Sequence, residues 1–461
     1  MKNDMDGKLF YAGYSGVRSF RIPSLLYTKK GTLIAAVDAR IQEGCDNPNR
    51  IDKVIRRSFD KGSSWSSMIT ALQMQGEGRK GCAAIDPCML YDEQTERIFL
   101  FYCYSPAGIG LQNANMGTGF DERGRKLLYD RQDNVYYMEK QKPAEHDRQD
   151  TVSDESTDRT DGLREVQPVF RVDEGRGLGG YLVDRDGEII RDGRKCGNIR
   201  LSGGELREFP TCYLQYIYSD DEGATWSEPV DVTSQVKAPW MRFIGPGPGR
   251  GIVKKRGVCQ GRYLIPVYYS NAYGLLSAAA VYSDDQGMSW HMGASPNDVR
   301  CAEESRLVID REDSLQEMQL VELQSGTIRA FIRNTMPEEV ICYADSTDGG
   351  ETWTAPEPLM YLRNPVCMLS AVGLHKEDDQ ILLSGPWHKK ERINGTVLCS
   401  TDGGLTAESV CRITEGGFGY SCLAQLDEDS VAILYEVDNG TPVVEEIRFR
   451  VLSLSRDFHK V

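Results

Sequence analysis

The sequence predicts an all-β protein, and three observations support this prediction. Apolar and polar residues alternate through short runs that end at Gly, Asp, Asn or Pro, as in half-buried strands joined by tight turns. Helical periodicity is nearly absent. An octet of the form Ser-x-Asp-x-Gly-x-Thr/Ser-Trp recurs, and its copies at Ser219, Ser283 and Ser346 start 64 and then 63 residues apart, the length of about one four-stranded sheet with its loops.

The repeated octet has a structural chemistry of its own. Four copies keep the tryptophan and occupy residues 58–65, 219–226, 283–290 and 346–353. A fifth copy at 400–407 ends in Ala407 in place of the tryptophan. In this pattern the Asp accepts hydrogen bonds from turn amides, the Gly supplies a positive φ and the Trp packs beneath the hairpin. The octet therefore predicts a stapled turn and no catalysis.

The composition excludes several classes of partner. The chain has 54 Lys and Arg against 69 Asp and Glu, and its formal net charge of −15 argues against binding to nucleic acid or to an anionic membrane. An anionic ligand would therefore need a local cluster of arginines. The 13 cysteines lack zinc-type spacing and indicate reduced thiols, and 5 scattered histidines offer no metal site, so we expect no cofactor.

Targeting signals are not apparent in the sequence. The amino-terminal residues contain no apolar segment after their charges, and no run in the chain reaches a membrane-spanning length. We therefore expect no membrane insertion and a cytoplasmic location. A trimmed form of a secreted protein would have a similar sequence, although its odd number of cysteines would then be unexpected.

The octets and a motif near the amino terminus together resemble the bacterial sialidases of glycoside hydrolase family 33. Residues 20–23 read Phe-Arg-Ile-Pro, a strand-like run and Arg40 follow, and an exposed turn around Asp46 precedes the first octet. The octets are similar to the Asp-boxes of that family, and the clostridial and streptococcal large sialidases are the most similar members. Because one blade usually lacks a box, the five copies imply a six-bladed β-propeller.

An insertion separates the first two octets, which start 161 residues apart at Ser58 and Ser219. Its composition leaves two interpretations open: a partly disordered surface loop, or a small β subdomain with strands at 181–183 and 188–190. We favour the subdomain, because larger bacterial sialidases carry one at this place. The expected domains are therefore a propeller of residues 1–106 and 209–461 and an inserted subdomain of residues 107–208.

Three arginines are candidates for binding a carboxylate. Sialic acid carries a carboxylate on its anomeric carbon, and the planar fork of arginine pairs with both carboxylate oxygens. The resemblance identifies Arg21, Arg333 and Arg392 as such a clamp. Each alone is as readily a solvated side chain, and Arg392 lies in a Lys-Lys-Glu-Arg run where a neighbouring lysine competes for the role. Three arginines in the family's order nevertheless favour an anion site.

The resemblance also implies catalytic roles for three residues. Tyr420 is the expected nucleophile, Glu317 is its base, and Asp46 is the acid that later activates water. A neutral phenol suits this reaction, because an attacking carboxylate would be repelled by the carboxylate of the sugar. Asp52 competes with Asp46 for the acid role, and Glu322 competes with Glu317 at the other end of the same strand.

Further residues complete the implied site and its function. Arg40 and Asp86 are expected to contact the substrate near its O4, and Glu436 is expected to orient Arg21. The resemblance thus implies a retaining exo-α-sialidase that acts on sialylated glycans or oligosaccharides through a tyrosyl intermediate. Two alternatives are an intramolecular trans-sialidase, which releases 2,7-anhydro-sialic acid, and a propeller that binds sialoglycans without catalysis. A lectin would need only the arginines, so the additional candidates favour an enzyme.

Overall fold

The protein is described by a computed structural model that covers residues 7–140, 170–174, 177–297, 314–374, 378–437 and 443–458. The chain divides into two compact units. The larger unit comprises Met1–Thr118 and Pro210–Val461, and the smaller unit comprises Gly119–Phe209. The expected insertion of residues 107–208 begins before Gly119 and ends next to Phe209.

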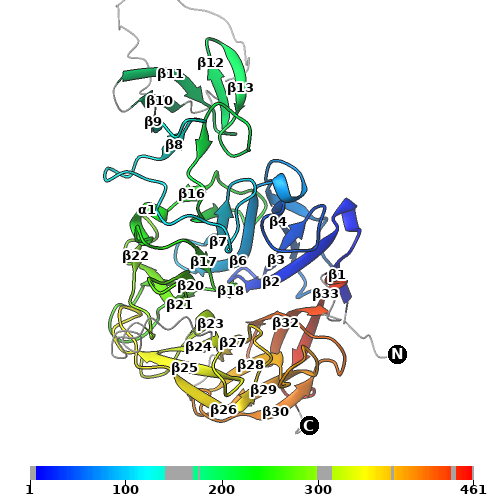
Figure 1. The fold of residues 1–461 in the computed structure, drawn as a ribbon. Helices are drawn as coiled ribbons and strands as arrows, with labels where there is room; N and C mark the ends of the chain where they lie inside the picture. Colours follow the sequence, from blue (N-terminus) through cyan, green and yellow to red (C-terminus); the bar gives the residue numbers. More distant parts are fainter. Residues whose placement is uncertain are drawn as a thin grey trace, which may run out of the picture. The chain divides into compact units, whose positions relative to one another are not determined.

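The larger unit is a β-propeller of six blades (Figure 1). The prediction of an all-β, six-bladed propeller is therefore confirmed. The first two blades belong to one sheet in which β4 and β6 join through a parallel pair, Ile51 opposite Ala83. The other blades are separate sheets of four or five strands.

Five blades are built from segments that follow one another along the chain, and the smaller unit is inserted within the second of them. The first contains β2 (Ser19–Tyr27), β3 (Leu33–Arg40), β4 (Ile51–Ser58) and β5 (Ile69–Leu72). The second contains β6 (Ala83–Asp92), β7 (Arg97–Ser105), β15 (Tyr213–Ser219) and β16 (Val230–Asp231). The third contains β17 (Ile244–Pro246), β19 (Ile252–Val253), β20 (Tyr263–Ser270), β21 (Leu276–Ser283) and β22 (His291–Met292), while β18 (Gly249–Arg250) pairs with β6. The fourth contains β23 (Leu315–Glu322), β24 (Ile328–Asn334), β25 (Val340–Ser346) and β26 (Glu357–Arg363), and the fifth contains β27 (Ser370–Gly373), β28 (Ile381–Pro386), β29 (Gly395–Ser400) and β30 (Glu408–Arg412).

The sixth blade closes the ring with segments from both ends of the chain. It contains β31 (Ser421–Gln425), β32 (Ser430–Val437), β33 (Glu446–Ser453) and β1 (Gly7–Tyr11). β1 runs antiparallel to β33, with Gly7 opposite Phe449 (Figure 1). This pairing covers strand edges that would otherwise expose unpaired backbone groups. The short helices of the described residues are α1 (Thr233–Val236), η1 (Tyr14–Gly16) and η2 (Gly78–Lys80).

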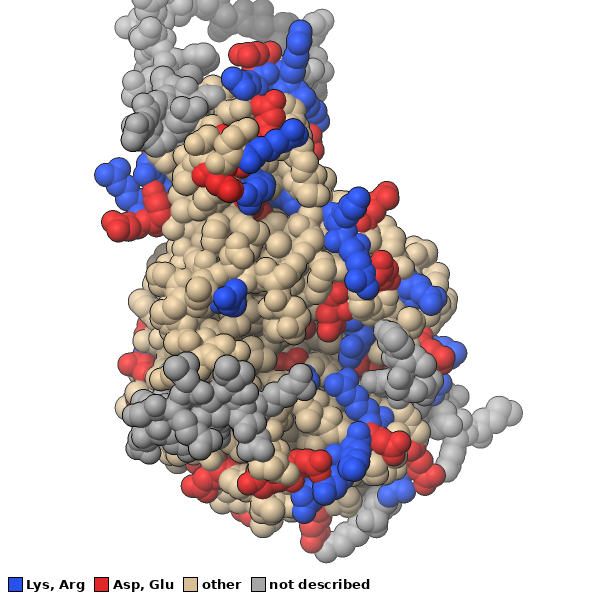
Figure 2. Space-filling model, in the orientation of Figure 1, with Lys and Arg blue, Asp and Glu red and all other residues tan. Residues whose placement is uncertain are grey.

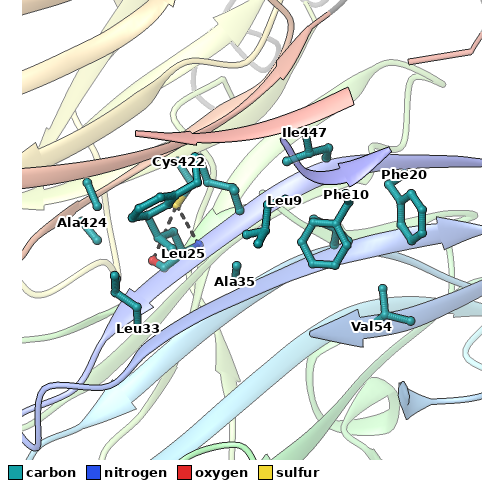
Figure 3. Packing of buried hydrophobic residues seen from close by; sticks show 14 of the residues in the cluster. Leu9, Phe10, Phe20, Leu25, Leu33, Ala35, Val54, Cys422, Ala424 and Ile447 are labelled. Carbon is teal, nitrogen blue, oxygen red and sulfur yellow. Dashed lines mark hydrogen bonds between the residues drawn. The ribbon is translucent and has the colours of Figure 1, made fainter. Parts of the chain in front are cut away.

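The hydrophobic core of the propeller lies between neighbouring blades. Where the sixth blade meets the first, Leu9, Phe10, Leu25, Cys422 and Ile447 are at most 3% exposed (Figure 3). The backbone N–H of Leu25 also donates to the Cys422 sulfur at 3.2 Å. Burying a leucine, isoleucine or phenylalanine side chain contributes about 1.5–3 kcal/mol. The contacts between blades therefore hold the ring together.

The octets form the turns that the sequence predicts. In the first copy, Asp60 accepts hydrogen bonds from the Ser58 hydroxyl at 2.8 Å and from the Ser64 amide at 2.8 Å. In the fifth copy, Asp402 accepts the same bonds from Ser400 and Thr406 although the tryptophan is missing. The turn therefore depends on the aspartate and its hydroxyl partners more than on the aromatic ring.

The smaller unit is one sheet of seven strands. These strands are β8 (Leu127–Tyr129), β9 (Val135–Lys140), β10 (Phe170–Glu174), β11 (Gly177–Val183), β12 (Glu188–Arg191), β13 (Arg194–Asn198) and β14 (Arg207–Glu208). Leu128, Tyr136, Val183, Ile189 and Leu206 form its core. The strands expected at 181–183 and 188–190 lie in β11 and β12, which favours a folded β subdomain over a disordered loop.

Two features of the described residues bear on the environment of the protein. No disulfide joins the cysteines in the described ranges. None of the helices in those ranges has the length and apolar character that crossing a membrane requires.

Candidate active site

A cavity of about 280 Å³ in the larger unit gathers most of the predicted site residues. Those that line it are Arg21, Asp46, Asp86, Glu317, Arg333, Arg392 and Tyr420. These residues come from segments that are far apart in the sequence, but they lie at the same end of the strands. For example, β29 begins three residues after Arg392 and ends at Ser400, where the fifth octet starts. The octets therefore lie at the end of the blades opposite the cavity.

Charge is mixed on the surface of the molecule. On the face drawn in Figure 2, acidic and basic side chains are interspersed, and neither sign covers the face alone. Recognition of an anion must therefore come from the arginines inside the cavity. This agrees with the net charge of −15, which provides no general attraction for anions.

Tyr420 lies at the centre of a hydrogen-bonded group. Its hydroxyl donates to both oxygens of Glu317 at 2.8 Å and accepts a bond from Arg333 Nη1 at 2.6 Å. Arg333 Nη1 also donates to Glu317 at 2.6 Å. Burial raises the pKa of Tyr420 well above its ordinary value, and Glu317 adds to this increase while Arg333 opposes it. The phenol is therefore protonated, and Glu317 is placed to accept its proton.

Glu436 fixes the position of Arg21 and of the backbone beside Tyr420. The Arg21 guanidinium donates to Glu436 through Nε at 3.1 Å and Nη2 at 3.0 Å. The backbone amides of Ile22 and Tyr420 donate to the same carboxylate. Burial opposes the charge of Glu436, but Arg21 and these hydrogen bonds outweigh it and lower the pKa. Among the described residues Arg21 Nη1 has no partner, so it is available to a ligand.

Arg392 completes the group of three arginines. The guanidinium carbons of Arg392 and Arg21 lie 5.5 and 5.6 Å from the centre of the Tyr420 ring. Arg392 Nη2 lies 3.4 Å from the Val366 carbonyl oxygen. The competing Lys389 is exposed and pairs with Glu339 at 3.1 Å. The sequence left this choice open, and the cavity contains the arginine.

Asp46 reaches the cavity from the loop between β3 and β4. Its side chain is 67% exposed, and Arg40 Nη2 donates to it at 2.5 Å. Partial burial would raise the pKa of Asp46, but the charges of Arg40 and Arg21 outweigh it and lower the pKa. Asp52 instead pairs with Arg50 at 3.0 Å and accepts a bond from the Met74 amide. Asp52 does not line the cavity, so the structure separates the two candidates.

Arg40 lies outside the cavity lining, whereas Glu322 lies where the sequence predicts it, at the other end of the strand from Glu317. Arg40 is only 1% exposed and does not line the cavity, because its guanidinium donates to Asp46 and to the Gly44 carbonyl. Glu322 ends β23, at the opposite end of the strand from Glu317, and binds Lys254 at 3.1 Å. Arg40 is therefore placed to bind Asp46 and to lower its pKa, whereas Glu322 has a structural role.

Asp86 belongs to a buried polar network behind the cavity. It accepts a hydrogen bond from the Tyr268 hydroxyl at 2.9 Å, and its φ of 64° lies in the left-handed region. Burial, followed by the charges of Glu317 and Asp38, raises the pKa of Asp86 well above its ordinary value. Asp38 forms an ion pair with the buried Lys53. A carboxyl group with a raised pKa and a left-handed backbone at a cavity wall is typical of a binding site.

Sequence reasoning missed the apolar wall of the cavity. Ile85, Leu111, Phe243 and Leu276 line it together with Tyr268. Ordinary strand and loop residues carry no pattern that marks them as a wall. A signal was available for the network behind Asp86, because Asp38 and Lys53 are charged residues in strands that otherwise read as buried.

Comparisons with known proteins agree with this geometry. A family model described as a BNR repeat-like domain matches residues 200–433. An anhydrosialidase from Macrobdella decora is 31% identical over 93% of this chain and 59% of its own length. A sialidase from Bacteroides fragilis is 26% identical over 92% of this chain and 61% of its own length. The chain thus spans about three fifths of these relatives.

Two solved structures share the fold over nearly the whole chain. The intramolecular trans-sialidase from Ruminococcus gnavus, in complex with oseltamivir carboxylate, is 24% identical with a TM-score of 0.79 and covers 100% of both chains. The leech intramolecular trans-sialidase complexed with 2,7-anhydro-Neu5Ac is 26% identical with a TM-score of 0.78, and the match covers 98% of this chain and 71% of the leech protein.

Proposed function

Because this chain belongs to the bacterial sialidase family, we propose that it is an exo-α-sialidase that removes terminal α-linked sialic acid from glycans or oligosaccharides. The observation that carries the proposal is the hydrogen bond between the Tyr420 hydroxyl and Glu317 inside a cavity lined by three arginines. A binding protein would need the arginines but not this nucleophile and base. The reaction proceeds with retention, because it consists of two displacements at one carbon.

Substrate binding is assigned to Arg21, Arg333 and Arg392. Their guanidinium groups neutralise the carboxylate on the anomeric carbon and hold it beside the Tyr420 hydroxyl. This placement brings nucleophile and reacting carbon together before reaction, which lowers the entropic part of the barrier. The same charges stabilise a transition state in which positive charge develops next to a fixed carboxylate.

The first displacement uses Tyr420, Glu317 and Asp46. The phenol oxygen forms a bond to the anomeric carbon as its proton moves to Glu317, while the bond to the leaving oxygen breaks and Asp46 gives that oxygen a proton. In the second displacement Asp46 takes a proton from water as the water oxygen attacks the anomeric carbon. The tyrosine oxygen leaves and recovers its proton from Glu317, which restores the site.

Asp46 must be protonated for the first step, although Arg40 and Arg21 lower its pKa in the empty cavity. A substrate carboxylate bound to Arg21 and Arg333 offsets two of the positive charges that act on Asp46. Binding of the correct substrate therefore raises the pKa of the acid. A neutral sugar in the cavity would leave Asp46 ionised and unable to donate.

A second candidate function uses the same residues. The similarity to the Macrobdella decora anhydrosialidase favours an intramolecular trans-sialidase. In that reaction O7 of the bound sugar, and not water, attacks the anomeric carbon of the tyrosyl intermediate. The product is then 2,7-anhydro-sialic acid.

Two measurements test these functions. Mass spectrometry after treatment with 2,3-difluorosialic acid should find the sugar on the peptide that contains Tyr420. An unmodified peptide, together with no turnover of α2,3- or α2,6-sialyllactose, would reject the enzyme. Time-resolved proton NMR with α2,3-sialyllactose separates the two reactions, since hydrolysis first releases free α-sialic acid and trans-sialylation first releases the 2,7-anhydro sugar.

A further inference from the structure

A second cavity, of about 470 Å³, lies between the fourth and fifth blades of the propeller. Tyr361 of β26 forms one side. Trp387 and Asn394, from the segment between β28 and β29, and Ser409 and Arg412 of β30 contribute to the other. No lining residue is common to this cavity and the active-site cavity.

The two aromatic rings of the second cavity are held in place by their polar atoms. The Tyr361 hydroxyl donates to the Gly404 carbonyl at 2.6 Å, and Trp387 Nε1 donates to the Thr396 carbonyl at 2.8 Å. A Cβ atom at Gly385 would lie 2.9 Å from the Trp387 ring, so glycine is required for the ring to pack there. Because the polar atoms are already bound, the rings offer a ligand their apolar surface.

Unused hydrogen-bonding groups lie beside these rings. Within the described part of the chain, the Asn394 amide and the Ser409 hydroxyl have no hydrogen-bond partner. Arg412 pairs with Glu415 at 3.2 Å, so its charge is already balanced. The cavity therefore provides an apolar surface with neutral donors and acceptors and shows no preference for an anion.

We propose that the second cavity binds a neutral hexose unit of a glycan. A pyranose ring has an apolar face of C–H groups and a rim of hydroxyls, which match the aromatic surface and the Asn394 and Ser409 side chains. A purely apolar ligand would bury these two side chains without hydrogen bonds, which costs free energy. This inference rests on the proposed function, because a sialylated glycan supplies neutral sugars next to its sialic acid.

The position of the cavity relates it to the active site. Asn394 lines the second cavity and Arg392 lines the first, and two residues of extended chain span about 7 Å at most. A neutral sugar held at the second cavity keeps the rest of a branched or multivalent glycan near the active site. The tether raises the effective concentration of the next sialic acid without any new contact in the first cavity.

Saturation-transfer NMR with lactose tests the binding directly. Lactose on the order of 10 mM, which suits weak binding, should receive saturation from the wild-type protein even after 2,3-difluorosialic acid has filled the active site. Trp387→Ala should weaken lactose binding about tenfold, because an aromatic contact and its buried area are lost. Ser409→Trp fills the cavity, replaces the Ser409 hydroxyl and leaves Trp387 in place, and it should have the same effect. Phe59→Ala, which changes an exposed aromatic residue of the first octet, is the matched control and should bind like the wild type.

Three results would overturn the proposal. They are displacement of lactose by the active-site ligand, unchanged lactose binding in both Trp387→Ala and Ser409→Trp, and no saturation transfer from the wild-type protein to lactose. None of these readouts needs turnover, so they are independent of the failure of the proposed activity. For an active enzyme, Trp387→Ala should lower kcat/KM for a multivalent sialoglycoprotein at least about threefold and leave a small fluorogenic sialoside unaffected. An equal effect on both substrates would point to structural damage.

Discussion

The two ends of the propeller blades differ in how far apart in the sequence their hydrogen-bonded residues lie. At one end, the carboxylate of the third octet residue accepts hydrogen bonds from residues within four positions, as that of Asp60 does from Ser58 and Ser64. At the other end, the bond between Tyr420 and Glu317 spans 103 residues, and the bond between Arg21 and Glu436 spans 415. Local bonds stabilise each turn independently, whereas the active site exists only when the ring has closed.

This difference has a consequence for mutations. A change at an octet removes a few bonds in one turn and should lower stability without changing the chemistry. A change at the cavity end should act on the chemistry, on ring closure, or on both, according to the group removed.

The largest effect is expected from Tyr420→Phe. Loss of the nucleophilic oxygen should lower kcat for a small sialoside by about 10³-fold or more, while the melting temperature changes little. Steady-state kinetics and thermal unfolding measure the two quantities. The matched control is Tyr282→Phe, which removes a phenol hydroxyl from a residue that does not line the cavity. Activity within a few-fold of the wild type would remove Tyr420 from its role.

A second, smaller effect is expected from Glu436→Ala. Removing one partner of a buried ion pair leaves the Arg21 charge without compensation and costs about 3–5 kcal/mol of unfolding free energy. KM should rise as well, because Arg21 loses its orientation. Denaturant unfolding and kinetics check both, and Glu436→Gln, which keeps the acceptor oxygen, should be milder. Wild-type stability of Glu436→Gln would show that the charge of Glu436 is unimportant.

An octet variant gives the opposite pattern. Asp348→Ala removes bonds from the Ser346 hydroxyl and from the Thr352 amide and should cost about 1–2 kcal/mol of stability. kcat should stay within about twofold of the wild type below the unfolding transition, because the turn lies away from the cavity. A large loss of kcat with an intact fold would contradict the separation between the two ends of the blades.

The smallest effect concerns pH. Arg40 lowers the pKa of Asp46, so Arg40→Gln should raise that pKa. Because Asp46 must be protonated to act as an acid, kcat/KM falls as pH rises through its pKa in the free enzyme. The alkaline limb of the kcat/KM profile should therefore move to higher pH in Arg40→Gln. Arg50→Gln, which changes the partner of Asp52, is the matched control and should leave the limb in place.

Several choices that the sequence left open depend on contacts between distant segments. Asp46 lies in the loop before β4 and Asp52 is the second residue of β4, and only the position of the cavity separates the two candidates. Arg392 and Lys389 are three residues apart, and they differ in whether the side chain enters the cavity or pairs with Glu339. Spacing along the chain contains no information about these directions, because a loop has no fixed periodicity.

The sequence by itself determined the blades and the identity of the candidate residues. The octets are complete within eight residues, and the hydrogen bonds of their third-position aspartate carboxylates involve only neighbours, so their pattern and spacing specify the sheets. Only the tertiary structure decided that Arg40 binds Asp46, that Glu436 also accepts bonds from the Ile22 and Tyr420 amides, and that a second cavity lies between two blades. These features depend on side chains that meet after the last blade pairs β33 with β1, and burial and charge at such meetings are properties of the packed ring.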